Sequence, residues 1–143
     1  MPPFSAEPST DHAALRAALH ELVGRFLGDY ERAAGAHGLT LPQARALGFA
    51  ACEPLSQRAL AARFGCDPSN ISVLVDRLVE RALVERRTDP ADGRVKLIAA
   101  TDTGRSVAEA CCRDRAWLGE ALDALAPDER ESVRAALGLL LRG

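Results

Sequence analysis

Small polar side chains gather where a helix is predicted to begin, just after Asp67 and Pro68. Ser69, Asn70 and Ser72 lie near this N-terminal end, where short side chains and free backbone N–H groups can bond phosphate oxygens or base edges. Arg77 follows two turns later, a position that suits a phosphate or a guanine. Residues of these types at this spacing favour recognition of nucleic acid.

A second group with chemical potential is the tripeptide Asp92-Gly93-Arg94. Glycine permits a tight turn, and a carboxylate two residues before an arginine can orient the guanidinium by charge-assisted hydrogen bonds. An arginine held in this way would fit a DNA minor groove. Taken alone, the two charges would instead be read as a solvated surface pair, and only their position in the chain favours the first interpretation.

Two predicted helices separated by a tight turn position the first group. Ser56 is an N-cap candidate for a short helix with Ala59, Leu60 and Phe64 facing inward, and Gly65 ends it. The second helix has one apolar stripe at helical spacing, formed by Ile71, Leu74, Val75, Leu78 and Ala82. Its opposite face is polar, which is the plan of a helix-turn-helix.

A β-hairpin is predicted directly after these helices and positions the second group. Residues 83–87 and 94–100 form short aliphatic runs around a turn-rich insert. A hairpin in this place is a wing, so the second helix would enter a major groove and the hairpin tip the adjacent minor groove. The predicted DNA contacts are Ser56, Ser69, Asn70, Ser72, Val73, Arg77, Arg86, Asp92, Arg94 and Lys96.

The remaining segments predict further helices on both sides of this region. Residues 1–10 read as a disordered arm, 11–38 as a long dimerisation helix and 39–101 as the winged helix-turn-helix lobe, with Thr40 as an N-cap candidate. Residues 102–143 read as C-terminal dimerisation helices, one running from the N-cap candidate Thr101 to about residue 122 and one opening at Pro127. The expected fold class is mainly α with a small β-hairpin wing.

Composition is compatible with this interpretation. The 143 residues suit one compact domain. The net charge of −2 is unevenly distributed, because residues 56–96 carry a net charge of +2 and the rest of the chain carries −4. The four cysteines follow no Cys-x-x-Cys pattern, so reduced thiols are expected. Without an apolar run of about 18 residues or a signal sequence, a cytoplasmic protein without membrane contact is expected.

Residues 39–105 resemble the MarR family of bacterial transcriptional regulators. The most specific segments are "SNISVLVDRLVERALVERR", "DPADGR" and the Thr101-x-x-Gly104 motif. The resemblance implies an obligate homodimer whose terminal helices interlock, and whose two winged lobes reach successive major grooves of a near-palindrome. It also implies repression, with Ser69, Asn70, Ser72 and Val73 in the major groove and Arg94, oriented by Asp92, in the minor groove.

Two residues depart from the family pattern. Ala82 replaces the usual glycine after the recognition helix, so a left-handed backbone there would cost about 1 kcal/mol. Val73 replaces a commonly polar residue, which suggests contact with a thymine methyl group.

The resemblance further implies release from DNA by phenolic or aromatic acids, oxidants or, more rarely, metals. Tyr30, Arg45 and Trp117 are candidates for binding an aromatic carboxylate, with ordinary core and surface roles as the alternative. Cys66, just before the recognition helix, is the candidate thiol switch because a helix N-terminus favours a thiolate, with a small core residue as the alternative. Cys111 and Cys112 are expected to fill a dimer interface rather than form an intersubunit disulfide.

Other classes of protein are disfavoured. The sequence contains no Gly-x-Ser-x-Gly, Gly-x-Gly-x-x-Gly or His-Glu-x-x-His motif, so no catalytic residue and no cofactor is expected. The three histidines lack the close ligand spacing of a metal site. The alternative function is a winged-helix module that binds protein and has lost DNA binding.

Overall fold

Seven helices and three short strands make up the part of the chain, residues 10–142, that the computed structural model describes. The elements are α1 (Thr10–Ala36), α2 (Leu41–Cys52), β1 (Leu55–Ser56), α3 (Gln57–Phe64), α4 (Pro68–Glu80), β2 (Val84–Thr88), β3 (Lys96–Ala100), α5 (Asp102–Arg113), α6 (Ala116–Asp123) and α7 (Pro127–Leu140). The predicted class, mainly helical with a small β wing, is confirmed. The predicted disordered arm lies outside the described residues except for Thr10, where α1 begins.

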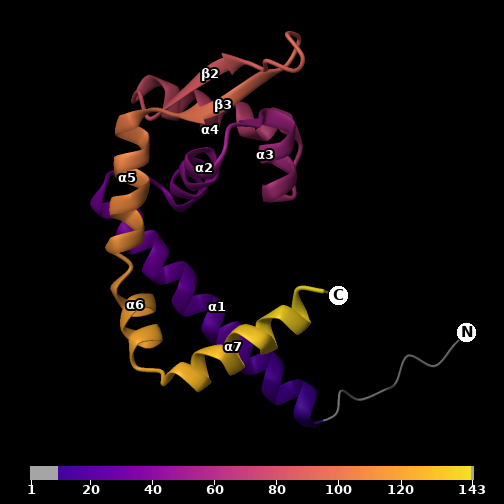
Figure 1. Cartoon of the computed structure of the whole chain (residues 1–143), viewed down its shortest axis with the longest axis vertical. Coiled ribbons are helices and arrows are strands. Elements are labelled where there is room, and N and C mark those ends of the chain that lie inside the picture. The colour runs from indigo at the N-terminus through magenta and orange to yellow at the C-terminus, as the bar shows by residue number, and fades with distance from the viewer. Residues whose placement is uncertain (1–9, 143) are drawn as a thin grey trace, which may run out of the picture. The chain divides into compact units, whose positions relative to one another are not determined.

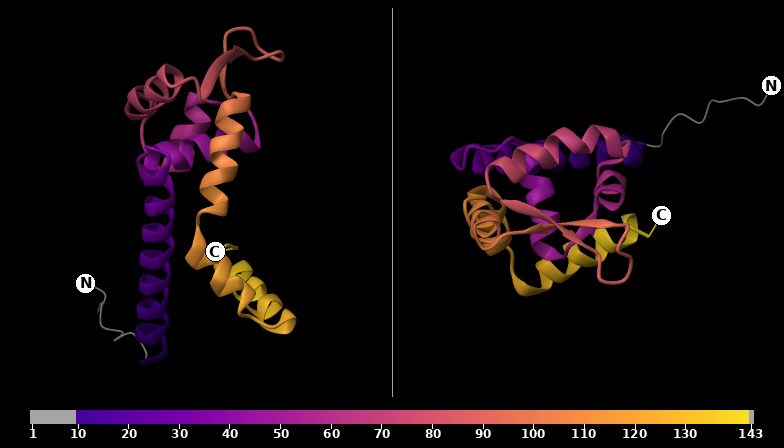
Figure 2. Two further views of the ribbon diagram at one scale, coloured as in Figure 1. Left: turned by 90° about the vertical axis from the view of Figure 1, so that its left-hand side faces the viewer. Right: turned by 90° about the horizontal axis from the view of Figure 1, so that it is seen from above.

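The chain divides into two compact units, which are described separately. The winged lobe is Tyr30–Arg115, and the terminal unit comprises the described residues of Met1–Asp29 and Ala116–Gly143. In the winged lobe, α2, α3 and α4 pack beside the β2–β3 hairpin, and the loop joining these strands projects away from the helices (Figures 1 and 2).

A continuous apolar core holds the winged lobe together. Its largest fully buried side chains are Leu47, Leu60, Val75, Leu78 and Val84. Burying each such side chain stabilises the lobe by roughly 1.5–3 kcal/mol relative to an exposed position. The prediction from sequence was wrong at two core positions. Ala59 is exposed, and Ala61 is buried beside Leu60 instead, because α3 turns the face carrying Leu60 and Ala61 to the core. Ala82, predicted at the end of the buried stripe of the second helix, is exposed because α4 ends at Glu80.

The helix-turn-helix is fixed by local hydrogen bonds. The Ser56 hydroxyl accepts from the backbone N–H of Ala59 at 3.1 Å and caps α3 as predicted. Gly65 ends α3 with φ 64°, a left-handed conformation that glycine adopts without penalty. The side-chain amide of Gln57 donates to the Pro68 carbonyl at 2.8 Å, so the start of α3 is tied to the start of α4.

The sheet has one strand more than predicted. Its order is β1-β3-β2 and both pairings are antiparallel, with Val84 opposite Ala100 and Leu55 opposite Ile98. The two-residue strand β1 has no alternating pattern that sequence reading could detect, and it forms because β3 presents a free edge to the chain leading into α3.

Ala82 adopts the left-handed conformation that its position after the recognition helix suggested. Its φ is 55°, and the backbone N–H of Leu83 bonds back to the Leu78 carbonyl at 3.0 Å. This is the Schellman pattern of helix termination, in which glycine is usual because a Cβ is disfavoured. The chain therefore tolerates local strain between α4 and the hairpin.

Ala82→Gly is expected to raise the free energy of unfolding by up to about 1 kcal/mol. Glycine removes the strain of a left-handed alanine, and this gain is larger than the stability lost because glycine gives the unfolded chain more conformational entropy. Urea unfolding followed by circular dichroism measures the change. As a matched control, Ala62→Gly at an exposed position within α3 is expected to lower stability by about 1 kcal/mol. Equal losses in the two variants would show that Ala82 is unstrained.

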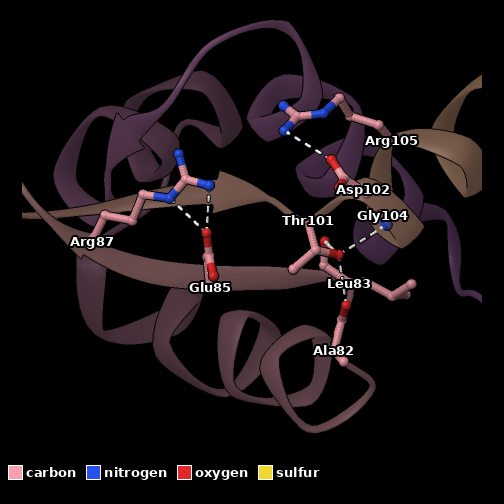
Figure 3. Close-up of polar contacts among 8 residues, drawn as sticks. All are labelled: Ala82, Leu83, Glu85, Arg87, Thr101, Asp102, Gly104 and Arg105. Atoms are coloured by element: carbon pink, nitrogen blue, oxygen red, sulfur yellow. Dashed lines mark hydrogen bonds and ion pairs between the residues drawn. The ribbon is translucent and has the colours of Figure 1, made fainter.

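Hydrogen bonds join the start of α5 to the chain between α4 and β2 (Figure 3). The Thr101 hydroxyl donates to the Ala82 carbonyl at 2.6 Å and accepts from the backbone N–H of Gly104 at 3.0 Å, which confirms Thr101 as an N-cap. The backbone N–H of Thr101 donates to the Leu83 carbonyl at 3.1 Å. These bonds bring the Gly104 backbone against Leu83.

The predicted single helix from Thr101 to about residue 122 is wrong, because α5 ends at Arg113 and α6 begins at Ala116. Long-range contacts stabilise the break. The Asp114 carboxylate lies 2.7 Å from His37 Nε2, and the buried Asp29 carboxylate accepts from the backbone N–H groups of Trp117 and Leu118 at 3.3 and 3.2 Å. Asp29 thus supplies from α1 the cap that the start of α6 needs.

The terminal unit exposes most of its apolar side chains. Among its described residues only Asp29 is buried. The exposed large apolar side chains of this unit are Leu15, Leu22, Val23, Phe26, Leu27, Leu122, Val133, Leu137, Leu139, Leu140 and Leu141. In the part of the chain that the structure describes, no helix combines the length and apolar character needed to cross a membrane.

Candidate nucleic-acid interface

One face of α4 is free of core contacts and carries the predicted DNA-reading residues. Ile71, Val75 and Leu78 are buried on the opposite face. Ser69, Asn70 and Arg77 are exposed, Ser72 is half-buried, and Val73 is 62% exposed despite its apolar side chain. The buried stripe therefore fixes which side of α4 faces solvent.

The N-terminus of α4 is open to an anion. Asp67 occupies the N-cap position but its side chain makes no capping hydrogen bond, and Pro68 opens the helix. The helix dipole places partial positive charge at this end, and side chains or ligands normally satisfy the first N–H groups. A phosphate oxygen beside Ser69 would meet favourable electrostatics.

The tip of the hairpin differs in one detail from its predicted form. Asp92 was expected to orient the Arg94 guanidinium, but its carboxylate accepts from the backbone N–H of Arg94 at 3.0 Å. Asp89 accepts in the same way from the Ala91 N–H at 2.8 Å. Both carboxylates thus shape the turn, as aspartates in Asx turns do. The Arg94 side chain is exposed and keeps its freedom to reach a groove.

Three further predicted contacts already have partners within the lobe. Arg86 on β2 bonds the Asp76 carboxylate of α4 at 2.5 Å, the Lys96 ammonium donates to the Thr88 hydroxyl at 2.6 Å, and the Ser56 hydroxyl caps α3. Exposed pairs of this kind are worth about 0–1 kcal/mol, so a DNA phosphate can compete for the two cations. The Arg86–Asp76 pair also joins the hairpin to the recognition helix.

Arg81 is an organising residue that sequence reasoning missed. Its guanidinium donates to the Gly38 carbonyl at 2.8 Å and to the His37 carbonyl at 3.0 Å. These bonds tie the C-terminal end of α4 to the loop between α1 and α2. Arg81 is more than 40 residues from His37 and Gly38 in the sequence, and no local pattern predicts this contact.

The three candidate effector residues lie in separate settings. The Tyr30 hydroxyl donates to the Ala44 carbonyl at 3.2 Å, and Arg115 lies over the Tyr30 ring at 4.6 Å. Burial raises the pKa of Tyr30 above its ordinary value. Arg45 stacks over the Phe64 ring at 4.7 Å, whereas Trp117 belongs to the terminal unit.

The four cysteines are all free and differ in exposure. Cys66 is half-buried and packs against the core, and Cys111 is buried. Burial raises the pKa of the Cys111 thiol. Cys52 and Cys112 are exposed. Within residues 10–142 no group of three or more His, Cys, Asp or Glu side chains is arranged to hold a metal ion.

Comparison with known proteins places this geometry among transcriptional regulators. The model of the MarR family matches residues 37–95. A crystal structure of a MarR-family transcriptional regulator from Rhodococcus sp. RHA1 is 34% identical, with a TM-score of 0.70 over 92% of this chain and 95% of that one. CouR from Rhodococcus jostii RHA1, crystallised with p-coumaroyl-CoA, is also 34% identical, with a TM-score of 0.67 over 84% of this chain and 86% of that one.

A curated relative gives the same indication over a shorter segment. An HTH-type transcriptional regulator of Mycobacterium tuberculosis is 33% identical over 84 residues, which is 58% of this chain. The match spans 59% of that relative's length.

Proposed function

The chain belongs to the MarR family of transcriptional regulators, and from this membership we propose that it binds a near-palindromic operator as a homodimer and represses transcription. One observation carries the proposal. The α4 face opposite the core stripe exposes Ser69, Asn70 and Val73, and the hairpin of the same lobe presents Arg94. A helix face and a separate cation on one rigid lobe suit a major groove and its neighbouring minor groove.

The proposed roles divide between reading bases and holding phosphates. Asn70 pairs with an adenine edge and Val73 contacts a thymine methyl group, while the N-terminal end of α4 and Arg77 bind phosphate. Arg94 enters the minor groove, where electrostatic attraction is strong. Since Asp92 holds the backbone at Arg94, it acts through the shape of the turn.

The surface of the terminal unit supports the proposed dimerisation. Its helices expose many large apolar side chains, and its described residues bury only Asp29, so the unit has no apolar core of its own. A concentration of exposed apolar side chains is typical of an interface. A second copy of the chain covers it, and the two-fold symmetry of the pair matches a near-palindrome.

A small aromatic or phenolic compound is the proposed signal for release. CouR, which resembles this chain over most of its length, was crystallised with p-coumaroyl-CoA. Tyr30, Arg45 and Trp117 are the proposed contacts, because rings and guanidinium groups suit an aromatic acid. Oxidation at Cys66 is the proposed alternative signal, since this thiol directly precedes the recognition helix.

A mobility-shift assay on the DNA upstream of the coding sequence tests the proposal. The parent protein is expected to shift this DNA at nanomolar concentration in the presence of random competitor, and less at higher salt. Equal binding to random DNA would contradict operator recognition. No shift at any salt concentration would overturn DNA binding and favour a winged helix that binds protein.

Arg94→Ala and Asn70→Ala are expected to weaken binding in different ways. Loss of Arg94 removes a contact to the minor groove, so affinity for every sequence falls about tenfold and the salt slope decreases by about 1. Loss of Asn70 lowers affinity for the operator about tenfold but leaves binding to random DNA unchanged. Fluorescence anisotropy with both DNAs separates the two effects.

Arg105→Ala is the matched control for Arg94→Ala, because it removes one exposed arginine from α5, outside the proposed interface. It is expected to bind like the parent. If Arg94→Ala and Arg105→Ala had the same small effect, the hairpin tip would not contact DNA.

A further inference from the structure

The loop that joins β2 to β3 has a hydrogen-bonded tip. The backbone N–H of Asp89 donates to the Val95 carbonyl at 2.9 Å and closes the loop. Within the loop, the Val95 N–H donates to the Asp92 carbonyl at 3.0 Å, and the Asp92 carboxylate accepts from the Arg94 N–H. The position of Arg94 therefore depends on the main chain that runs from Asp92 to Val95.

The peptide bond between Asp92 and Gly93 is chemically distinct within this chain. Asp92 is the only aspartate in the sequence that a glycine follows. The other aspartates precede proline, as Asp67 and Asp89 do, or belong to helices and their caps. Proline has no N–H, and a helix fixes the backbone torsions, so ring closure between the side chain and the next peptide nitrogen is hindered in both settings.

The peptide nitrogen of Gly93 is available for reaction. Among residues 10–142, no atom accepts a hydrogen bond from the Gly93 N–H. Gly93 is exposed, and a Cβ there would meet nothing within 4 Å, so there is open space beside this peptide. The Asp92 carboxylate bonds the following N–H and so folds over the Gly93 peptide group, which holds the two reacting groups together.

We propose that Asp92 and Gly93 form a site of spontaneous modification, at which the hairpin tip rearranges through a cyclic imide to isoaspartate and loses affinity for DNA. The Gly93 nitrogen bonds to the Asp92 Cγ. One carboxyl oxygen leaves as water, with the carboxyl proton and the proton of that nitrogen. Water then opens the ring. Attack at Cγ restores aspartate, whereas attack at the main-chain carbonyl carbon breaks its bond to the Gly93 nitrogen, and the chain then runs through Cγ.

Isoaspartate changes the shape of the tip. The Asp92 Cβ enters the main chain, and the free carboxylate is shorter by the same methylene group. The bonds that Asp92 accepts from the N–H groups of Arg94 and Val95 require the normal connectivity. Arg94 is therefore displaced from the position in which it would enter a minor groove. This consequence for DNA rests on the proposed function, whereas the rearrangement itself does not.

Asp89 is an internal control in the same loop. Its carboxylate accepts from the Ala91 N–H at 2.8 Å, in the same way as the Asp92 carboxylate accepts from Arg94. The residue that follows Asp89 is Pro90, whose nitrogen carries no hydrogen and cannot close the ring. The two aspartates thus make the same local bond and differ in the feature that the reaction needs.

The test stores the full-length protein without DNA at neutral pH and physiological temperature. Peptide mass spectrometry and methylation by protein L-isoaspartyl methyltransferase locate isoaspartate and measure its amount. Asp92 is expected to be the principal site, with none at Asp89. Conversion is expected to be about threefold faster than in an unfolded peptide of residues 86–98, because the turn holds the reacting groups together.

Two substitutions are expected to change the rate in opposite directions. Gly93→Ala places a methyl group beside the attacking nitrogen and slows conversion about tenfold, while the open space at this position preserves the fold. Asp92→Asn keeps a side-chain oxygen for the Arg94 N–H. It is expected to convert about tenfold faster, because a neutral amide is attacked more readily than an ionised carboxylate. Circular dichroism confirms that both variants are folded.

A DNA-binding measurement tests the consequence for function. Aged parent protein that carries isoaspartate is expected to bind the upstream DNA about tenfold more weakly than fresh protein, as Arg94→Ala does. Treatment with the methyltransferase and S-adenosylmethionine, which returns isoaspartate to aspartate, is expected to restore affinity. Fresh and aged Gly93→Ala are expected to bind alike.

Conversion of Asp92 no faster than in the unfolded peptide, or equally fast in the parent and a folded Gly93→Ala variant, would overturn the proposed site. Aged protein that binds the DNA as tightly as fresh protein would overturn its effect on binding. Fresh protein that binds no DNA would instead contradict the proposed function, while the storage experiment would still decide whether Asp92 is modified.

Discussion

Gly104→Ala is expected to lower the free energy of unfolding by about 3 kcal/mol or more, although alanine is normally the better helix former. A Cβ at this position would lie 1.8 Å from the Leu83 carbonyl oxygen and 2.8 Å from the Leu83 carbonyl carbon. Backbone atoms cannot yield as a flexible side chain would, so α5 must move away from the chain before β2. The clash then exceeds the gain of about 1 kcal/mol from helix propensity.

The clash would also disturb the proposed DNA interface. Thr101 bonds both Gly104 and Ala82, so a shift of α5 breaks contacts at the point where α4 leads into the hairpin (Figure 3). Arg86 and Asp76 join the same two elements further along. Displacement at this junction changes the position of the recognition helix relative to the hairpin tip. Gly104→Ala is therefore expected to lower the affinity for the operator as well as the free energy of unfolding.

Denaturant unfolding of the parent and Gly104→Ala measures the effect. Gly119→Ala is the matched control, because Gly119 also lies within a helix and a Cβ there meets nothing within 4 Å. This control is expected to gain up to about 1 kcal/mol. A Gly104→Ala protein as stable as the parent would show that α5 does not depend on close approach to Leu83.

Leu137→Asp is expected to raise the dissociation constant of the dimer about a thousandfold. Leu137 is 41% exposed and lies with Val133 and Leu140 at helical spacing on α7. If this stripe is covered by the second copy, each substitution removes apolar burial and forces a carboxylate into the interface. Two copies at about 2 kcal/mol each give the thousandfold change.

Light scattering across a concentration series measures the oligomeric state of this variant. Val73→Asp is the control, because it replaces another exposed apolar residue by the same charge but on the α4 face. It is expected to remain dimeric while losing operator affinity. A Leu137→Asp protein that remains dimeric at nanomolar concentration would exclude this stripe from the interface.

Features governed by neighbours in the chain could be predicted from sequence. The caps at Ser56 and Thr101, the helix end at Gly65 and the left-handed Ala82 depend on contacts within a few residues or on a fixed place after a helix. The α4 stripe and the hairpin follow from periodicity. Together these local rules place the residues of the candidate interface.

Features governed by distant contacts could not be predicted. The break between α5 and α6 depends on Asp29, which lies far back in α1 and caps α6 from there. Strand β1 depends on the free edge of β3. The spacing of Asp92 and Arg94 allows the carboxylate to bond either the backbone or the side chain of Arg94, and the conformation of the turn decides between them.

Hydroxyl-radical footprinting of the upstream DNA shows whether two copies of one winged lobe read neighbouring turns of a duplex. We expect two protected segments related by two-fold symmetry, with centres about one helical turn apart, and added minor-groove protection that disappears with Arg94→Ala. A single unsymmetric footprint, or no protection at concentrations that saturate the mobility shift, would contradict binding by two symmetric lobes.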